Sequence, residues 1–313
     1  MTDVLRQTDG DVVGQPVKRL RAGDRVRLVS PCSPPYADRV EAGVSMLRSW
    51  GLEVEVPDPA VAGAPLRGVA ERAAELQSAL ADPEVHAVLV TRAGSGAREL
   101  VDEVDLGVLR EQPKFFGGFS DVGYLHAAVG RLCDSPSFHV PEIAWNGRLN
   151  RELSARSLRQ ALMGEMTGVG AGTGEGVWSG PTVTGTLTGG NLSILAGIDA
   201  APRRTGPSVL LLEDLRETPE SIGRLLPALQ DRGHTEGVVA VVFGQFEDCG
   251  DPAEVTDVLT TWADGVVPTF LTGVAVGHGS EQHSVALNWP VTVNTRLGTV
   301  VPAQQPTSVD VTW

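Results

Sequence analysis

Apolar and polar positions alternate with two periods along the first half of the chain. DRVRLVS (24–30), LEVEVP (52–57) and the nearly all-apolar HAVLVTR (86–92) are typical of strands. Between them, residues 36–51 and 71–82 repeat apolar positions every three or four residues, as amphipathic helices do. The order β-α-β-α-β predicts an α/β fold, a doubly wound parallel sheet with helices on both faces.

The same alternation continues to about residue 165. We expect a helix over 97–112, a strand over 114–120 and a second helix from Val122. A strand over 137–143 and a helix over 151–166 complete this part of the pattern.

The second half has a different character, because a glycine-rich segment (168–180) is followed by strand-like runs separated by turns. One helix is expected over 218–231. A mainly β or β-barrel-like second domain is therefore predicted. The strand-like runs span 182–189, 208–214, 237–246, 291–301 and 307–313. The expected division is a leader (1–17), an α/β domain (18–165), a linker (166–182) and a β-rich domain (183–313).

Composition narrows the classes of partner. The chain has 313 residues and a formal net charge of −14, which disfavours nucleic acid and anionic membranes but tolerates a small cationic substrate. Cys32, Cys133 and Cys249 lack the spacing of a disulfide framework or a zinc site, so no metal is expected. No apolar run approaches the ~20 residues of a membrane span, and the N-terminus does not resemble a secretory signal. We expect a cytoplasmic protein.

Ser120 is the first candidate for chemistry. The loops 30–34, 92–98 and 117–121 are expected at the carboxyl edge of the parallel sheet, where ligands of such folds gather. A serine between strand and helix, with Gly118 two residues before it, fits a nucleophile elbow. The amide of Asp121 at the helix start then faces a developing oxyanion. Helix capping by the serine is the alternative, and spacing alone does not exclude it.

The glycine loop RAGSG (92–96) offers further amides at the same edge. They fit a second oxyanion donor, or alternatively a phosphate cradle, although neither the GxGxxG nor the GxxxxGK[ST] pattern is present.

A nucleophilic serine needs a base and an acid that orients it. Among six histidines, His278 stands between two glycines just after an apolar run, and His283 is its competitor. Glu213 and Asp214 end a strongly apolar strand, and Glu217 lies further along. A buried Glu213 requires a partner, whereas at the strand exit it could instead be solvated.

These segments together resemble the LD-carboxypeptidases, the serine peptidase family that also includes the microcin C immunity peptidases. The likeness runs from about residue 20 to the C-terminus. Its motifs occur in the family's order: SPCSP (30–34), RAGSGARELVDEVD (92–105), GGFSD (117–121), GTLTGGNLSIL (185–195), LLLEDLRETPESIGRLL (210–226), VFGQFEDC (242–249) and GVAVGHG (273–279).

The resemblance implies that Ser120 is the nucleophile, His278 the general base and Glu213 the acid that holds the imidazole. It implies oxyanion donation by the amides of Asp121 and Gly94, without a metal or cofactor. It also implies an N-terminal α/β domain with the serine, a C-terminal β-barrel-like domain with the other two groups, and a homodimer.

Departures from the family pattern concern substrate contacts. Ser95 stands where the family's RGGYG loop has tyrosine, and Ala93 replaces a glycine. The family's histidine or tyrosine before a Gly-Pro pair appears here in FHVPEI (138–143), with Val140 where glycine is common. Arg92 is a candidate partner of a substrate carboxylate, or else belongs to a structural ion pair. Asn191 is a candidate substrate contact, or else a turn residue.

The expected activity is hydrolysis of an amide in a small peptide, most specifically removal of a terminal D-amino acid from a muropeptide. A microcin-immunity-like amidase is the first alternative, with Trp145 or Trp178 stacking on a nucleotide base. A non-catalytic binding module and a cofactor-binding α/β protein are the others. The intact Ser120, Glu213 and His278 argue against the binding module, and no cofactor fingerprint supports the last.

Overall fold

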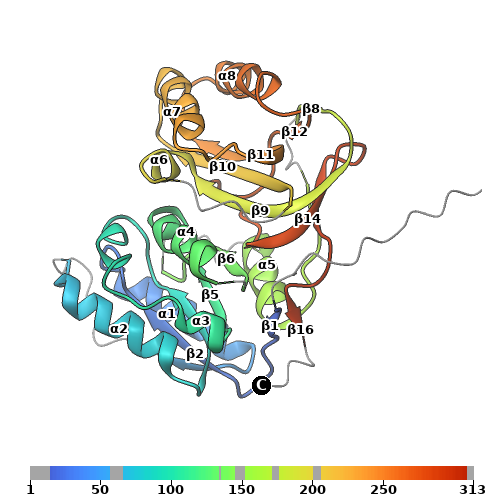
Figure 1. Ribbon diagram of the computed structural model, residues 1–313. Coiled ribbons are helices and arrows are strands. Elements are labelled where there is room, and N and C mark those ends of the chain that lie inside the picture. The colour runs from blue at the N-terminus through green and yellow to red at the C-terminus, as the bar shows by residue number, and fades with distance from the viewer. Residues whose placement is uncertain are drawn as a thin grey trace, which may run out of the picture.

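The computed structural model describes residues 15–56, 66–133, 135–144, 152–170, 176–199 and 206–308. Within these ranges the strands form a six-stranded sheet, an eight-stranded sheet and a two-stranded pair. The first half of the chain forms one layered body and the second half forms another that lies against it (Figure 1). The predicted α/β fold class is confirmed.

The six-stranded sheet is parallel except for the edge strand β13, which runs antiparallel to its neighbour. Helices α1 and α5 pack on one face, and α2, α3 and α4 pack on the other. The order of the strands is β13 (Val285–Leu287), β6 (Ser137–His139), β5 (Phe115–Gly118), β4 (Val85–Val90), β2 (Arg25–Val29) and β3 (Glu53–Glu55). The helices are α1 (Ala37–Ser49), α2 (Val69–Ala81), α3 (Val108–Glu111), α4 (Gly123–Leu132) and α5 (Glu152–Met163).

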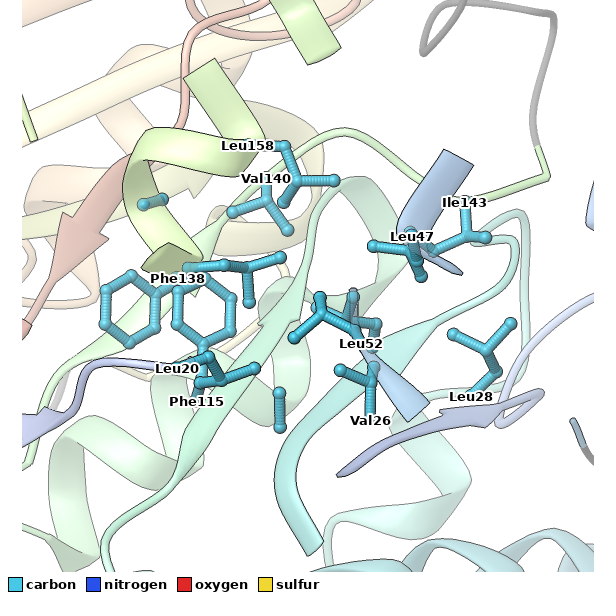
Figure 2. Packing of buried hydrophobic residues seen from close by; sticks show 14 of the residues in the cluster. Leu20, Val26, Leu28, Leu47, Leu52, Phe115, Phe138, Val140, Ile143 and Leu158 are labelled. Atoms are coloured by element: carbon cyan, nitrogen blue, oxygen red, sulfur yellow. The ribbon is translucent and has the colours of Figure 1, made fainter. Parts of the chain in front are cut away.

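The apolar run of β4 is explained by burial on both faces. Ala87 and Leu89 join the core beneath α1 and α5, whereas the alternate positions Val88 and Val90 join the core on the other face. In the first of these cores, Phe115 and Phe138 stack with ring centroids 3.8 Å apart (Figure 2). This packing fixes β5, which precedes the candidate serine, against β6, which ends at His139.

The eight-stranded sheet is mixed and curls into a half-barrel. Strands β9 to β12 are parallel, and antiparallel strands flank them. Its order is β7 (Val169–Gly170), β15 (Thr299–Pro302), β14 (Trp289–Asn294), β9 (Val183–Asn191), β10 (Ser208–Leu215), β11 (Val238–Glu247), β12 (Phe270–Leu271) and β8 (Trp178–Ser179). Helices α6 (Leu192–Leu195), α7 (Pro219–Asp231) and α8 (Pro252–Asp264) cover one face.

The two halves of the chain exchange strands. β13 comes from the second half but pairs with β6 in the first sheet, with Val285 opposite His139. Near the ends of the described chain, β1 (Val17–Lys18) pairs in parallel with β16 (Thr307–Ser308). The β13–β6 pairing therefore joins the second half of the chain to the first sheet beside His139.

Several elements differ from the sequence-based expectations. The helix expected over 97–112 is a short 3-10 helix (Arg98–Leu100) followed by α3. Between them the Asp105 carboxylate accepts a hydrogen bond from the amide of Gly107, a local turn that competes with helix. The expected strand 137–143 ends at His139.

The expected leader and linker also contain structure. Val17 is fully buried in β1, and β7 and β8 lie within the glycine-rich segment. Helices α6 and α8 were not expected, whereas α7 was. Of the strand expected over 307–313, residues 309–313 lie outside the described residues. None of the helices in the described ranges is both long and apolar enough to cross a membrane.

Candidate active site

Ser120 stands at a sharp turn between β5 and a 3-10 helix (Ser120–Val122) that leads into α4. Its φ of 58° is the left-handed conformation that non-glycine residues rarely adopt. The turn also requires a small residue at Gly118, where a Cβ atom would come within 3.0 Å of Val122. Ser120 therefore has the strained strand-to-helix geometry of a nucleophile elbow.

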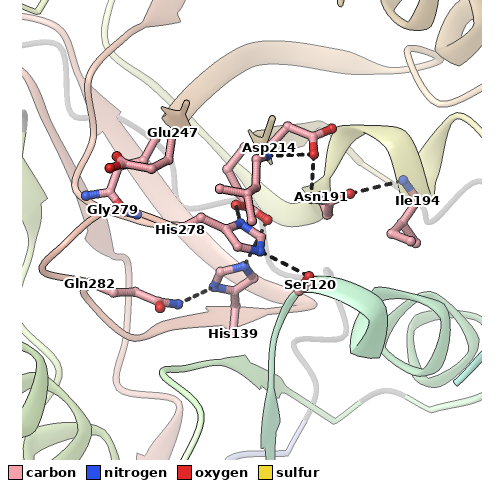
Figure 3. A network of polar contacts seen from close by, with 12 residues as sticks. Ser120, His139, Asn191, Ile194, Asp214, Glu247, His278, Gly279 and Gln282 are labelled. Atoms are coloured by element: carbon pink, nitrogen blue, oxygen red, sulfur yellow. Dashed lines mark hydrogen bonds and ion pairs between the residues drawn. The ribbon is translucent and has the colours of Figure 1, made fainter. Parts of the chain in front are cut away.

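His278 connects Ser120 to Glu213. Its Nε2 lies 3.0 Å from the Ser120 hydroxyl, and its Nδ1 lies 2.5 Å from Oε2 of Glu213 (Figure 3). Both the imidazole and the carboxylate are buried, and Ser120 is half-buried. The structure thus brings the three predicted residues together in one hydrogen-bonded chain, with the serine on the first sheet and Glu213 on the second.

Close backbone packing holds Glu213 and His278 in place. Glu213 lies in β10, between β9 and β11 of the second sheet, and its side chain is fully buried. A Cβ atom on Gly277 would lie 2.7 Å from Oε2 of Glu213, so glycine is needed there. Gln245 of β11 accepts a hydrogen bond from the amide of Gly279 and donates one to the carbonyl of Glu281. The GQF segment therefore fixes the loop that presents His278.

The Glu213 carboxyl is ionised despite its burial. Burial alone would raise the pKa of Glu213, but the charge of His278 and the contacts of both His139 and His278 outweigh it and lower this pKa to about 2. A carboxylate that stays charged can fix the tautomer of His278 and stabilise its protonated form.

His139, which stands at the family's histidine or tyrosine position but was given no catalytic role from the sequence, also faces Glu213. Its Nε2 lies 3.7 Å from Oε1 of Glu213, the oxygen that does not bind His278. Gln282 contacts the other ring nitrogen of His139 at 3.3 Å. Two signals were available, a histidine within a predicted strand and the family's histidine or tyrosine position in FHVPEI (138–143).

The amides predicted as oxyanion donors lie on two neighbouring loops. In the described part of the chain, neither the Asp121 amide nor the Gly94 amide has a hydrogen-bond acceptor. The Asp121 carboxylate accepts a hydrogen bond from the amide of Ala97, which joins the elbow to the glycine loop. Gly94 has a φ of 111° and lies against Ser33. Both amides remain available to a ligand.

Arg72 of α2 fastens the loops at this edge of the sheet. Its buried guanidinium donates to the carbonyls of Pro31 (2.6 Å) and Gly96 (2.8 Å) and pairs with the Glu99 carboxylate. Arg72 therefore joins the loops 30–34 and 92–98 to each other, and the sequence did not single it out.

Arg92 and Ser95 lie in the glycine loop itself. Arg92 donates to the carbonyl of Pro34 at 2.9 Å, and its guanidinium lies 4.8 Å from the centre of the Tyr36 ring. No ion pair involves Arg92 within the described residues, so its charge remains available to a ligand. Ser95 is exposed, and its amide donates to the hydroxyl of Ser33.

Asn191 makes internal contacts. Its side chain caps α6 through the amide of Ile194 (3.2 Å) and donates to Asp214 at 2.9 Å. Burial and the neighbouring charge of Glu213 raise the pKa of Asp214 to about 6. The side chain of Asn191 is 5% exposed, so it supports the backbone beside Glu213.

The rival candidates lie elsewhere. The backbone amide of His283 bonds to Ala275, and burial lowers the pKa of its half-buried ring. Glu217 accepts a hydrogen bond from Ser221 at the start of α7. Trp178 is exposed and packs beside Gly298 at the β14–β15 turn, whereas Trp145 lies outside the described residues. Within the described ranges, no group of three or more acidic, histidine or cysteine side chains is arranged to hold a metal.

Two family profiles match this chain. The LD-carboxypeptidase N-terminal domain matches residues 26–140, and the LD-carboxypeptidase C-terminal domain matches residues 184–293. A Streptomyces coelicolor protein named as a carboxypeptidase is 31% identical over 90% of this chain and 94% of its own length. A Bacillus subtilis protein named as a murein peptide carboxypeptidase is 26% identical over 91% of this chain and 93% of its own length.

Among solved structures, a mutant of the microcin C7 self-immunity protein in complex with adenosine monophosphate superimposes with a TM-score of 0.82. The identity is 20%, and the match covers 94% of this chain and 100% of that chain. At this identity the likeness concerns the fold. From the family profiles and the Streptomyces relative, the chain belongs to the LD-carboxypeptidase family of serine peptidases.

Proposed function

We propose that this peptidase is an LD-carboxypeptidase that removes a terminal D-amino acid from a murein-type peptide, with Ser120, His278 and Glu213 as its catalytic triad. The observation that carries the proposal is the buried chain of contacts, 3.0 Å from serine to imidazole and 2.5 Å from imidazole to carboxylate. This is the geometry of an activated nucleophile, its base and the group that orients the base.

The reaction follows from these positions. Nε2 of His278 accepts the hydroxyl proton of Ser120 as the serine oxygen attacks the scissile carbonyl carbon. The amides of Asp121 and Gly94 stabilise the oxyanion that forms. His278 then gives the proton to the leaving amine, and water, deprotonated by the same imidazole, releases the acyl group from the serine. Glu213 stays ionised throughout and holds the imidazole.

Arg92 and Ser95 are proposed to meet the substrate. A carboxypeptidase must recognise a terminal carboxylate, and a guanidinium suits that role because it is always charged and offers a fork of donors. Arg92 is half-buried at the edge where Ser120 stands and retains its charge, as described above. Ser95 leaves more space than the tyrosine common in the family, so the pocket is expected to accept a bulkier group.

A murein peptide is favoured because the Bacillus subtilis relative matches nearly the full length of this chain and is named for that substrate. The test is incubation with an L,D-tetrapeptide ending in D-alanine and, separately, with an aminoacyl-nucleotide analogue. Wild type should release D-alanine, and Ser120→Ala should not. Cleavage of the nucleotide conjugate alone would instead assign an immunity-type amidase. A homodimer remains a prediction, which the molar mass in solution would check.

A further inference from the structure

His139 occupies the side of the Glu213 carboxylate that His278 leaves open. Nε2 of His139 and Oε1 of Glu213 lie 3.7 Å apart, and the two side chains are 1% and 0% exposed. Within the described residues, neither atom has a hydrogen-bond partner, although burial normally requires one. Each is therefore the polar group that the other faces.

Gln282 defines which nitrogen of His139 bears the proton. Its amide nitrogen lies 3.3 Å from Nδ1 of His139, and this side chain is fully buried. With the amide nitrogen as the donor, Nδ1 accepts, and this arrangement corresponds to the tautomer that carries its proton on Nε2. That N–H group faces the Glu213 carboxylate, as a donor to an anion should.

The His139 ring is held in this orientation by its surroundings. Phe119, the residue before the serine, meets the ring edge-on with centroids 5.6 Å apart. β6, which contains His139, is paired on one side with β5 and on the other with β13. The donor is thus fixed to the first sheet, whereas Glu213 belongs to the second.

We propose that His139 is a positioning residue that donates a hydrogen bond to the second oxygen of Glu213. With both oxygens bound, the carboxylate keeps one orientation toward His278 while the imidazole takes and returns the serine proton. The separation of 3.7 Å closes by a small approach, because hydrogen bonds of catalytic groups commonly tighten when a ligand binds. This role rests on the proposed function of the triad, and His139, at 1% exposure, is proposed to act through Glu213 rather than on the substrate.

Two further ionisable groups lie near this cluster. Asp214, beside Glu213 on β10, has a pKa raised by burial and by the charge of Glu213. His126 of α4 is fully buried and bonds to the carbonyl of Gly118, and burial lowers its pKa to about 4. His126 is therefore neutral at the pH of the assay. All variants are therefore compared at a single pH near 7.5, so that the titration of Asp214 or His126 is not mistaken for an effect of the His139 substitution.

The test measures how fast a fluorophosphonate probe labels Ser120, because this probe reports serine activation without requiring the natural substrate. His139→Phe keeps an aromatic ring but removes the donor. We expect its maximal labelling rate to fall about 10- to 100-fold, as when a residue that supports a catalytic group is lost. The probe concentration giving half the maximal rate should not change. His139→Gln, whose amide reaches the same position as Nε2, should retain a rate within about threefold of wild type.

The outcomes separate the two proposals. If wild type and Ser120→Ala are equally unlabelled, the proposed triad fails. If wild type is labelled at Ser120 and His139→Phe reacts equally fast, only the positioning role is overturned. Equal losses in the Phe and Gln variants, with unchanged melting temperatures, would also overturn it. Should His139→Phe not fold, His139→Asn replaces it, because its shorter amide cannot reach Glu213, and it must be slower than His139→Gln.

Discussion

The hydroxyl of Ser120 and the imidazole of His278 lie 3.0 Å apart, although 158 residues separate them in the chain. Ser120 stands two residues after the end of β5 in the first sheet, and His278 follows the last parallel strand of the second. Their contact therefore forms only when the two sheets pack correctly. The activity of the enzyme should therefore depend on the packing of the two sheets as well as on the catalytic residues themselves.

Glu213→Gln should abolish most activity with little change in shape. The amide cannot stabilise a protonated His278 as a carboxylate does, so kcat should fall by about 10³- to 10⁴-fold. The matched control is Glu217→Gln, which changes the rival acid of the same segment and should leave kcat within about threefold of wild type. Steady-state kinetics on the tetrapeptide measure both variants. Comparable losses in both would contradict the assignment.

Asp214 should make stability fall as the pH rises. Its folded pKa is raised from 3.8 to about 6, so the folded protein binds the proton more tightly than the unfolded chain. That contribution is complete below pH 3.8 and is lost as the pH passes 6, by about 3 kcal/mol at most. Melting temperatures between pH 4 and pH 7.5 should show a steeper decline for wild type than for Asp214→Asn. Parallel curves would refute this linkage.

Gly277→Ala should lower both stability and kcat. The new methyl group would lie 2.7 Å from Oε2 of Glu213, at a backbone φ of 126° that side chains disfavour. Backbone strain of this kind costs about 1–3 kcal/mol. Gly273→Ala is the control, because its φ of 73° is also positive but its Cβ would lie 3.6 Å from the nearest atom. Both variants should lose stability, but only Gly277→Ala should also reduce kcat. Equal kcat values for the two variants would contradict the proposed role of Gly277 beside Glu213.

Arg72→Met should loosen the loops beside the serine. Removing the guanidinium leaves the carbonyls of Pro31 and Gly96 without their donor, which should cost about 2–4 kcal/mol of unfolding free energy. Because the Gly96 loop contains the proposed Gly94 donor, kcat should also fall. Exposed Arg98 provides the control, since Arg98→Met should change neither quantity appreciably. Urea unfolding and kinetics measure the two effects, and a fully active Arg72→Met would argue against the clamp.

Local patterns were sufficient for most of the first sheet. β4 was recognised because both of its faces are buried, and α1 because its apolar positions repeat with helical spacing. The expected helix over 97–112 was wrong because the turn at Asp105 interrupts it. The place of β13 in the first sheet could not be predicted, since pairing between distant segments leaves no trace in a local pattern.

The candidate site shows the same limit. Ser120, Glu213 and His278 were chosen from short motifs and the family resemblance, and the structure places them in contact. His139 and Arg72 were missed as functional candidates because their significance comes from three-dimensional neighbours. A histidine in a strand and an arginine on a helix can serve many purposes. The role of His139 is recognised only from the Glu213 carboxylate that it faces, and the role of Arg72 only from the two loop carbonyls that it binds.

A double-mutant cycle on Ser120 and His278 tests the central claim most directly. The measurement is kcat/KM for D-alanine release by wild type, Ser120→Ala, His278→Ala and the double variant. If the two residues act as one unit, each single change should cost about as much as both together. Losses that multiply in the double variant, or substantial activity in His278→Ala, would show that the two groups act separately and would contradict the proposed triad.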